Sequence, residues 1–258
     1  MTRLAELKAY NAGAAAAGRG VVEAIHLYKS FGSHVVLNDM NLVLHEGENL
    51  VVLGKSGSGK SVLLKCISGL VKPDSGTVRV FGKDVSELSH KELDRLRVNI
   101  GYLFQYSALY DSMTVAENLA FPLRRHMRNK DKKEVVQLIE ETLKNVGLAH
   151  AIDMMPADLS GGMRKRIGLA RALIMHPKLM LYDEPTAGLD PMTSKEISEL
   201  ILHVQQKYET SSIIITHDIA SAEIVANRVI VLAEGRAYAE GTLSELRKVE
   251  DPKVKGFF

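Results

Sequence analysis

Short apolar runs alternate with stretches of helical periodicity along most of this chain. Asn49 to Leu53 is an apolar run of strand length, and residues 100–104, 178–182 and 212–216 have the same character. Between these runs apolar residues recur at helical spacing, as they do from Glu134 to Val146. Apolar strands separated by amphipathic helices predict an α/β fold with a mostly parallel sheet.

A glycine-rich segment joins the first of these strands to a helix. Leu53 is followed directly by Gly54-Lys55-Ser56-Gly57-Ser58-Gly59-Lys60-Ser61, and helical spacing begins at Val62. Glycines let backbone N–H groups converge on phosphate oxygens, and the helix adds its free N–H groups and positive dipole end. Lys60 would then reach the β- and γ-phosphates of a nucleotide, and the Ser61 hydroxyl would ligate Mg²⁺. A flexible linker, the alternative, would not lie between a buried strand and a periodic helix.

Polar residues follow the other three strands, at the edge where a parallel sheet collects ligands. Asp183 and Glu184 follow residues 178–182; Asp183 would support Mg²⁺, and Glu184 would act as general base on the attacking water. His217 follows residues 212–216, and Gln105 follows residues 100–104, where its amide could bridge Mg²⁺ and water. Taken alone, His217 and Gln105 fit a structural role about as well. On a regular strand, Asp183 and Glu184 would point to opposite sides.

A second glycine motif, Leu159-Ser160-Gly161-Gly162-Met163, has no evident partner in the same site. Ser160 is predicted to be the N-cap of a helix that two glycines open. We expect an uncapped start that leaves backbone N–H groups free to bind a phosphate. The chain places its own phosphates at Lys60, so we infer a head-to-tail dimer in which Ser160 and Gly162 of one copy contact the γ-phosphate held by the other.

Composition sets broad limits on the function. The 258 residues suffice for one large α/β domain, and a net charge of +2 gives no reason to expect nucleic-acid binding. No apolar run approaches the roughly 18 residues of a spanning helix, so a membrane role would need partner subunits. Residues 1–20 are interpreted as an N-terminal lead, because Glu6 and Lys8 interrupt the apolar core that a signal peptide needs. The single cysteine, Cys66, predicts core packing in a reducing cytosol.

Together these motifs resemble those of the ATP-binding subunits of ABC transporters. The resemblance runs from about Val21 to at least Gly241 and includes Phe31, where the family stacks an aromatic ring on adenine. It implies ATP and Mg²⁺ as cofactors, with Ser61, Gln105 and Asp183 as metal ligands and Lys60, Glu184 and His217 as catalytic residues. The nucleotide-binding residues that it implies are Phe31, Gly54, Lys55, Ser56, Gly57, Ser58, Gly59, Lys60, Ser61, Gln105, Ser160, Gly161 and Gly162.

The same resemblance implies the architecture. It predicts a RecA-like P-loop NTPase core with an N-terminal antiparallel β part, all within residues 21–258. A helical subdomain would be inserted at about residues 106–163. Smaller features, among them Met163 in the signature and residues 103–115, are similar to those of ATPases of the Mla/Mce phospholipid-transport group.

That closer resemblance implies phospholipid transport at the cytoplasmic face of the inner membrane, where the chain would be peripheral. Its partners would be a second copy of itself, transmembrane permease subunits, a Mce-type substrate-binding protein and a small regulatory subunit. Three alternatives remain open: another cargo such as an amino acid or a drug, a soluble ABC ATPase of DNA repair or translation, and a small-molecule kinase. The sequence does not name the cargo or the direction of transport.

Overall fold

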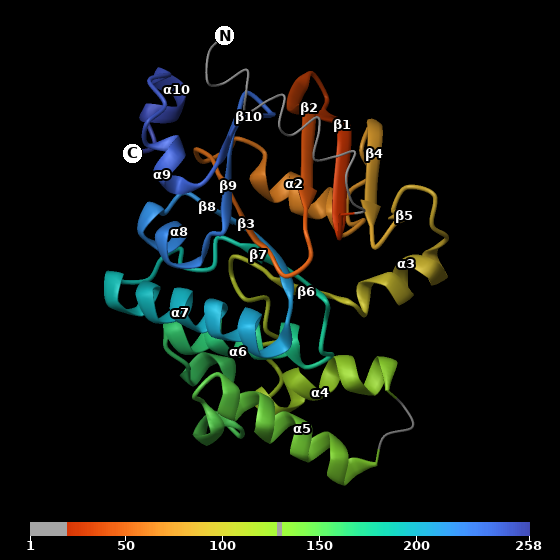
Figure 1. Ribbon diagram of the computed structural model, residues 1–258. Helices are drawn as coiled ribbons and strands as arrows, with labels where there is room; N and C mark the ends of the chain where they lie inside the picture. Colours follow the sequence, from red (N-terminus) through yellow and green to blue (C-terminus); the bar gives the residue numbers. More distant parts are fainter. Residues whose placement is uncertain (1–19, 128–130) are drawn as a thin grey trace.

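The computed structural model describes residues 20–127 and 131–258. Residues 1–19, nearly all of the predicted N-terminal lead, lie outside the described residues. The described strands form two sheets (Figure 1). Their bounds are β1 Val22–Phe31, β2 His34–Leu44, β3 Asn49–Leu53, β4 Ser75–Val80, β5 Lys83–Asp84, β6 Ile100–Leu103, β7 Leu179–Asp183, β8 Ser211–Thr216, β9 Arg228–Ala233 and β10 Arg236–Gly241.

The larger sheet positions the site. Among the described strands its order is β10-β9-β3-β8-β7-β6. β9, β3, β8, β7 and β6 are parallel, and β10 pairs antiparallel with β9 at one edge. Every residue of β3, β7 and β8 is buried, which explains why these strands are apolar without alternation. The smaller sheet, β2-β1-β4-β5, is antiparallel throughout.

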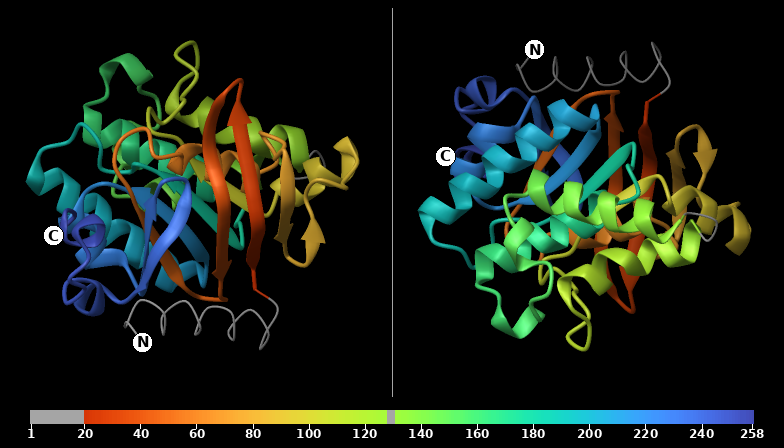
Figure 2. Two further views of the ribbon diagram at one scale, coloured as in Figure 1. Left: turned by 90° about the horizontal axis from the view of Figure 1, so that it is seen from above. Right: turned by 90° about the horizontal axis from the view of Figure 1, so that it is seen from below.

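Helices cover both faces of the larger sheet (Figure 2). α2 (Lys60–Ile67) packs between the two sheets, where its Leu63 and Leu64 join the core that β1, β2 and β3 share. On the opposite face, α6 (Gly161–Leu173), α7 (Pro191–Tyr208) and α8 (Ile219–Val225) bury their apolar residues against the same strands. The other helices among the described residues are α3 His90–Arg97, α4 Val115–His126, α5 Lys132–Asn145, α9 Leu243–Leu246 and α10 Pro252–Lys255, with short 3₁₀ turns at Ala149–Ala151 and Pro156–Asp158.

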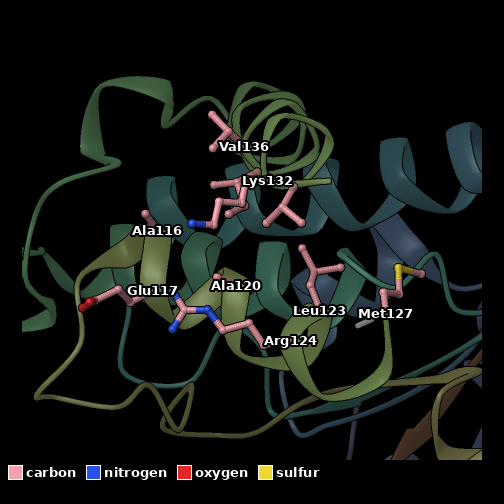
Figure 3. Close-up of a pocket in the computed structure, with 10 residues that line it drawn as sticks. Ala116, Glu117, Ala120, Leu123, Arg124, Met127, Lys132 and Val136 are labelled. Atoms are coloured by element: carbon pink, nitrogen blue, oxygen red, sulfur yellow. The ribbon is translucent and has the colours of Figure 1, made fainter. Parts of the chain in front are cut away.

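A third core lies between α4, α5 and α6, apart from the two sheet cores (Figure 1). Capping fixes where α4 begins, because the Thr114 hydroxyl accepts from the N–H of Glu117 and the Glu117 carboxylate accepts from the N–H of Thr114. α4 and α5 also enclose a groove of about 500 Å³ (Figure 3). Its lining is mainly apolar and also includes the charged residues Glu117, Arg124 and Lys132.

These features confirm the predicted fold class, a parallel α/β core with an N-terminal antiparallel part and inserted helices. No helix in the described ranges combines the length and apolar character that crossing a bilayer requires.

Candidate functional site

The glycine-rich segment forms a tight turn between β3 and α2. Gly59 is the N-cap of α2 and has φ 99°, a left-handed conformation that favours glycine. A Cβ at Gly59 would lie 2.8 Å from the carbonyl oxygen of Val36 and 2.9 Å from its Cγ1. No side chain caps the start of α2, so its first backbone N–H groups have no intrahelical acceptor and face the turn. The turn can therefore bind an anion through backbone N–H groups.

The hydroxyl of Ser58 shows whether the turn has room and hydrogen-bonding groups for a phosphate. This hydroxyl is buried and has no hydrogen-bond partner among the described residues. A Cβ at Gly54 would come within 2.5 Å of that hydroxyl oxygen, so only glycine at this position leaves the turn its shape. A buried hydroxyl without a partner, in a turn at the start of a helix, fits a phosphate oxygen as acceptor.

Lys60 lies inside the turn and links it to β7. Its ammonium donates to the carbonyl oxygens of Gly54 at 2.7 Å and Lys55 at 3.2 Å. The same nitrogen is 3.2 Å from Oε1 of Glu184, and both side chains are nearly buried. Lys60 is therefore held where a phosphate bound in the turn would meet its charge.

Ser61 and Asp183 form a pair of hard oxygen donors. The Ser61 hydroxyl donates to Oδ1 of Asp183 at 2.9 Å. Burial raises the pKa of the Asp183 carboxyl, the hydrogen bond from Ser61 opposes that shift, and the charge of Glu184 adds to it. Within residues 20–127 and 131–258 no group of three His, Cys, Asp or Glu residues could hold a metal by itself. The hydroxyl of Ser61 and the carboxylate of Asp183 are oxygen ligands of the kind that Mg²⁺ prefers, and Mg²⁺ completes its shell with water and substrate phosphates.

Glu184 joins Lys60 to His217. Its Oε2 lies 2.9 Å from Nδ1 of His217, whose side chain is 64% exposed. The backbone of Glu184 has φ 47°, so the alternation of the strand stops at Asp183. The expectation that the two carboxylates point to opposite sides is wrong for this reason: they reach Ser61 and Lys60, neighbours in the first turn of α2.

Three predicted groups lie apart from this cluster. Phe31 ends β1, is 52% exposed and has the ammonium of Lys29 5.3 Å from its ring centre. Gln105 is exposed in the turn after β6, and its side chain makes no hydrogen bond within the part of the chain that the structure describes. Ser160 and Gly161 are exposed at the start of α6, and no hydrogen bond or ion pair found among the described residues joins them to the turn of residues 54–61.

Ser160 is the N-cap of α6, as predicted, but its side chain also caps the helix, so the expectation of an uncapped start is wrong. The Ser160 hydroxyl accepts from the backbone N–H of Met163 at 3.2 Å. Gly161 and Gly162, as the first two helical residues, still have no intrahelical acceptor for their N–H groups. Met163 packs partly against the core between α4, α5 and α6.

Lys165 belongs to the site and was not predicted from the sequence. It lies on α6, is 5% exposed, and donates to the carbonyl oxygens of Gln105 at 2.6 Å and Glu184 at 3.1 Å. Burial lowers the pKa of its ammonium, while the charges of Asp183 and Glu184 oppose that shift. The sequence does contain a clue to its burial. Lys165 lies four residues before Leu169, so helical periodicity puts it on the apolar face of the helix.

Comparisons with known proteins agree with this geometry. The model of a family described as ABC transporter matches residues 37–187. The "Probable ribonucleotide transport ATP-binding protein mkl" of Mycobacterium bovis is 40% identical over 236 residues, which cover 92% of this chain and 66% of that protein. The "Methionine import ATP-binding protein MetN" of Campylobacter jejuni is 36% identical over 252 residues, covering 92% of this chain and 75% of that protein. The chain thus spans about two thirds of the length of the mkl relative.

Solved structures show the same fold. One, with 32% identity and a TM-score of 0.79, is the dimeric post-hydrolysis state of the ATP-binding cassette MJ0796 bound to ADP and Pi; the match covers 86% of this chain and 98% of that one. Another, with 31% identity and a TM-score of 0.81, is cbiO1 from Clostridium perfringens, described as part of the ABC transporter complex cbiONQ; the match covers 89% of this chain and 91% of that one. Because the family model matches more than half of the chain and three quarters of the MetN relative is covered, the chain belongs to the ABC transporter family, as an ATP-binding cassette.

Proposed function

We propose that this chain is the ATP-hydrolysing subunit of a membrane transporter and that two copies together build each active site. One observation carries the proposal: the phosphate-binding turn and the strand ends meet. Lys60 contacts Glu184, Ser61 contacts Asp183, and Glu184 contacts His217. A cation, two hard oxygen donors and a carboxylate beside an imidazole thus lie where the backbone can hold a triphosphate.

The roles of the binding residues follow from their surroundings. The backbone of residues 54–61 would hold the phosphates, and Lys60 would exchange its contact with Glu184 for the β- and γ-phosphate oxygens. Phe31, exposed at the end of β1, would stack on the adenine ring. Ser61, Asp183 and the side chain of Gln105 would hold Mg²⁺. When bound, this ion would neutralise charge on the phosphate oxygens.

Glu184 and His217 would act on the water. Once Lys60 has turned to the phosphates, the Glu184 carboxylate can accept a proton from the attacking water. His217 reaches Glu184 from the end of β8 and is largely exposed, so its ring can also turn toward the γ-phosphate. It would hold the water and the phosphate in line.

Ser160, Gly161 and Gly162 would complete the site of a second copy. They are exposed or half-buried at the start of α6, and no hydrogen bond or ion pair in the described part of the chain joins them to the turn of residues 54–61. Their free backbone N–H groups would reach the γ-phosphate that the other copy holds. The dimeric state of the solved cassette MJ0796 bound to ADP and Pi supports this arrangement.

Mixing two inactive variants tests the shared site. Ser160→Arg replaces the capping hydroxyl at the start of α6 with a bulky charged side chain, and Lys60→Ala removes the cation. In a mixed dimer one site carries both lesions and the other carries neither, so we expect ATPase activity in the mixture that neither variant shows alone. Monomeric Ser160→Arg should bind ATP as wild type does, measured by fluorescence of a labelled ATP analogue. Loss of that binding would place Ser160 in the pocket of its own chain and overturn the proposal.

A groove beside Gln105 is where we propose that the transmembrane permease docks. It measures about 330 Å³, and Phe104, Tyr110, Phe121 and Arg171 are among its lining residues. The rings of Tyr110 and Phe121 are 4.9 Å apart, and the neighbouring Tyr106 is 88% exposed. Aromatic residues at a surface hollow favour binding of a protein segment. Since Phe104 directly precedes Gln105, a segment seated there would press on the loop that carries Gln105. Tyr106→Asp should therefore reduce recovery of the permease with the chain without changing ATP binding.

The cargo that we propose is phospholipid, which would place the chain at the cytoplasmic face of the inner membrane with a Mce-type protein and a small regulatory subunit as further partners. The resemblance of residues 103–115 and Met163 to the Mla/Mce group supports this cargo. Two other cargoes have support from relatives, one named for methionine import and one for ribonucleotide transport. Purifying the chain from membranes and identifying the proteins and lipids that accompany it separates the three. A methionine-binding partner in place of a Mce-type protein would contradict the lipid cargo.

A further inference from the structure

Lys165 is a buried cation whose ammonium group donates hydrogen bonds to backbone carbonyl oxygens and does not pair with a carboxylate in the described part of the chain. Its ammonium donates to Gln105 O and Glu184 O, and among the described residues it makes no ion pair within 4.0 Å. Lysine is seldom this deeply buried, because taking an ammonium out of water is costly unless its charge is stabilised. Two charge-assisted hydrogen bonds, one of them 2.6 Å long, offset that cost here.

The carbonyl groups of Gln105 and Glu184 belong to the two loops that, in the proposed function, would hold the metal and the attacking water. Gln105 comes two residues after the end of β6, and Glu184 comes directly after β7. Glu184 adopts a left-handed backbone, and its carbonyl accepts from Lys165 and also from the N–H of Ala187 at 3.2 Å. Such a conformation is unfavourable for a residue other than glycine, so it depends on surrounding contacts. Lys165 supplies one of them.

The same face of α6 holds the segment that follows Gln105. Arg171 donates to the carbonyl oxygens of Ser107 at 2.9 Å and Ala108 at 2.8 Å. Gly168, between Lys165 and Arg171, lies so close to this segment that a Cβ there would come within 2.9 Å of the Ser107 Cβ. The loop after β6 is thus fixed to α6 by two cations and by close packing, so it would follow any displacement of that helix.

The exposed end of α6 is the part that the proposed function assigns to the other nucleotide. Ser160 caps the helix, and Lys165 lies five residues further on, which is about 7 to 8 Å along the axis. We propose that Lys165 is a positioning residue that links the two sites of the dimer. When the start of α6 binds the nucleotide held by the other copy, α6 moves, and Lys165 moves Gln105 and Glu184 of its own chain with it. The inference rests on the proposed function, because it requires α6 to contact that second nucleotide.

Lys165→Met tests the link, because methionine keeps most of the side-chain volume and loses both hydrogen bonds. We expect the variant to bind ATP as a monomer with a Kd within threefold of wild type. In a Glu184→Gln background it should still form an ATP-dependent dimer in sedimentation velocity, since Ser160, Gly161 and Gly162 are unchanged. In the otherwise unchanged chain, kcat should fall about 10- to 100-fold. Lys165→Arg, which keeps the charge and the donors, should recover at least a third of the wild-type kcat.

Two controls distinguish a loss of kcat caused by misplaced Gln105 and Glu184 from one caused by a less stable fold. Lys144→Met makes the same chemical change on the exposed surface of α5 and should leave kcat, Kd and dimer formation at wild-type values. If Lys165→Met melts below the assay temperature, Lys165→Leu, which also lacks a hydrogen-bond donor, replaces it, and the same split between kcat and dimer formation is required. A kcat within threefold of wild type overturns the inference. So does a loss of kcat that comes with loss of the ATP-dependent dimer, or a failure of Lys165→Arg to recover. Absence of ATPase activity or of dimers in the chain with native Lys165 would refute the proposed function itself and is a separate result.

Discussion

Glu184→Gln is the substitution whose consequences the structure defines most closely. Glutamine has the shape of glutamate but lacks its negative charge and its ability to accept a proton from water. Glu184 is 8% exposed, with Oε1 3.2 Å from the Lys60 ammonium and Oε2 2.9 Å from Nδ1 of His217. The change therefore opens no cavity, and its effect on turnover can be separated from an effect on folding.

Turnover and binding should move in opposite directions. Loss of a positioned base should lower kcat roughly 10²- to 10⁴-fold, about 2.7 to 5.4 kcal/mol in the barrier. ATP has to displace Glu184 from Lys60, and a hydrogen bond between charged groups contributes about 1.5 to 3 kcal/mol. The amide oxygen of glutamine can still accept a hydrogen bond from Lys60, so only part of this contribution is lost. We expect the Kd for ATP to fall by about tenfold or less, about 1.4 kcal/mol at most.

Two measurements check this expectation. The chain has no tryptophan, so a fluorescently labelled ATP analogue reports Kd, and phosphate release in the assembled transporter reports kcat. Glu199→Gln, the same change in an exposed pair with Lys195 on α7, should alter neither value by more than twofold. A loss of turnover smaller than tenfold would show that Glu184 is not the base. A Kd that rises tenfold would show that its contact with Lys60 does not compete with ATP.

Other substitutions probe the rest of the site. Lys60→Ala should abolish ATP binding or turnover, and His217→Ala should lower kcat by about 10² or more while ATP still binds; wild-type rates in either variant would contradict its role. Phe31→Ala should raise the Kd for ATP about 5- to 150-fold, the usual range for lost stacking of one base, with kcat nearly unchanged at saturation. Asp183→Asn should end activity yet raise the Tm at neutral pH. Burial raises the folded-state pKa of Asp183 above its ordinary value of 3.8, so the ionised carboxylate destabilises the fold once the pH exceeds both values, and the gain in Tm should vanish below about pH 4. A lower Tm for Asp183→Asn at pH 7 would show that neighbouring cations outweigh burial.

The central sheet could be predicted from the sequence because its strands are buried on both faces. The run Asn49 to Leu53 coincides with β3, and the polar residues that end the runs predicted near β7 and β8 do meet at one edge. In a parallel sheet the carboxyl ends of all strands lie at the same edge, so residues that follow neighbouring strands must lie close together. The helix after the glycine-rich turn could also be predicted, because the apolar residues from Val62 onward recur at helical spacing, and they form α2.

Contacts between side chains far apart in the sequence could not be predicted in this way. Periodicity places Lys165 on the buried stripe of α6 but does not say that two carbonyls lie opposite it. The left-handed backbone of Glu184 leaves no local signal either, because glutamate rarely adopts it. The Glu184 carboxylate therefore reaches Lys60, next to the Asp183 carboxylate at Ser61. Residue types also do not reveal that Gln105 contacts the site through its carbonyl oxygen while its side chain stays exposed.

The contact between Lys60 and Glu184 has a consequence for the isolated chain. In the proposed mechanism, phosphates that bind Lys60 within one copy would free the Glu184 carboxylate from its present contact, so ATP binding would prepare the base. The γ-phosphate would nevertheless lack Ser160, Gly161 and Gly162, which lie exposed or half-buried at the start of α6 and would act only on the nucleotide of a second copy. A lone chain should therefore bind ATP and turn it over slowly. At low concentration the amount of dimer rises with the square of the chain concentration, so the rate per chain should rise in proportion to concentration and then level off. A rate per chain that is fast and independent of concentration, in a species that sediments as a monomer, would show that one copy holds a complete site.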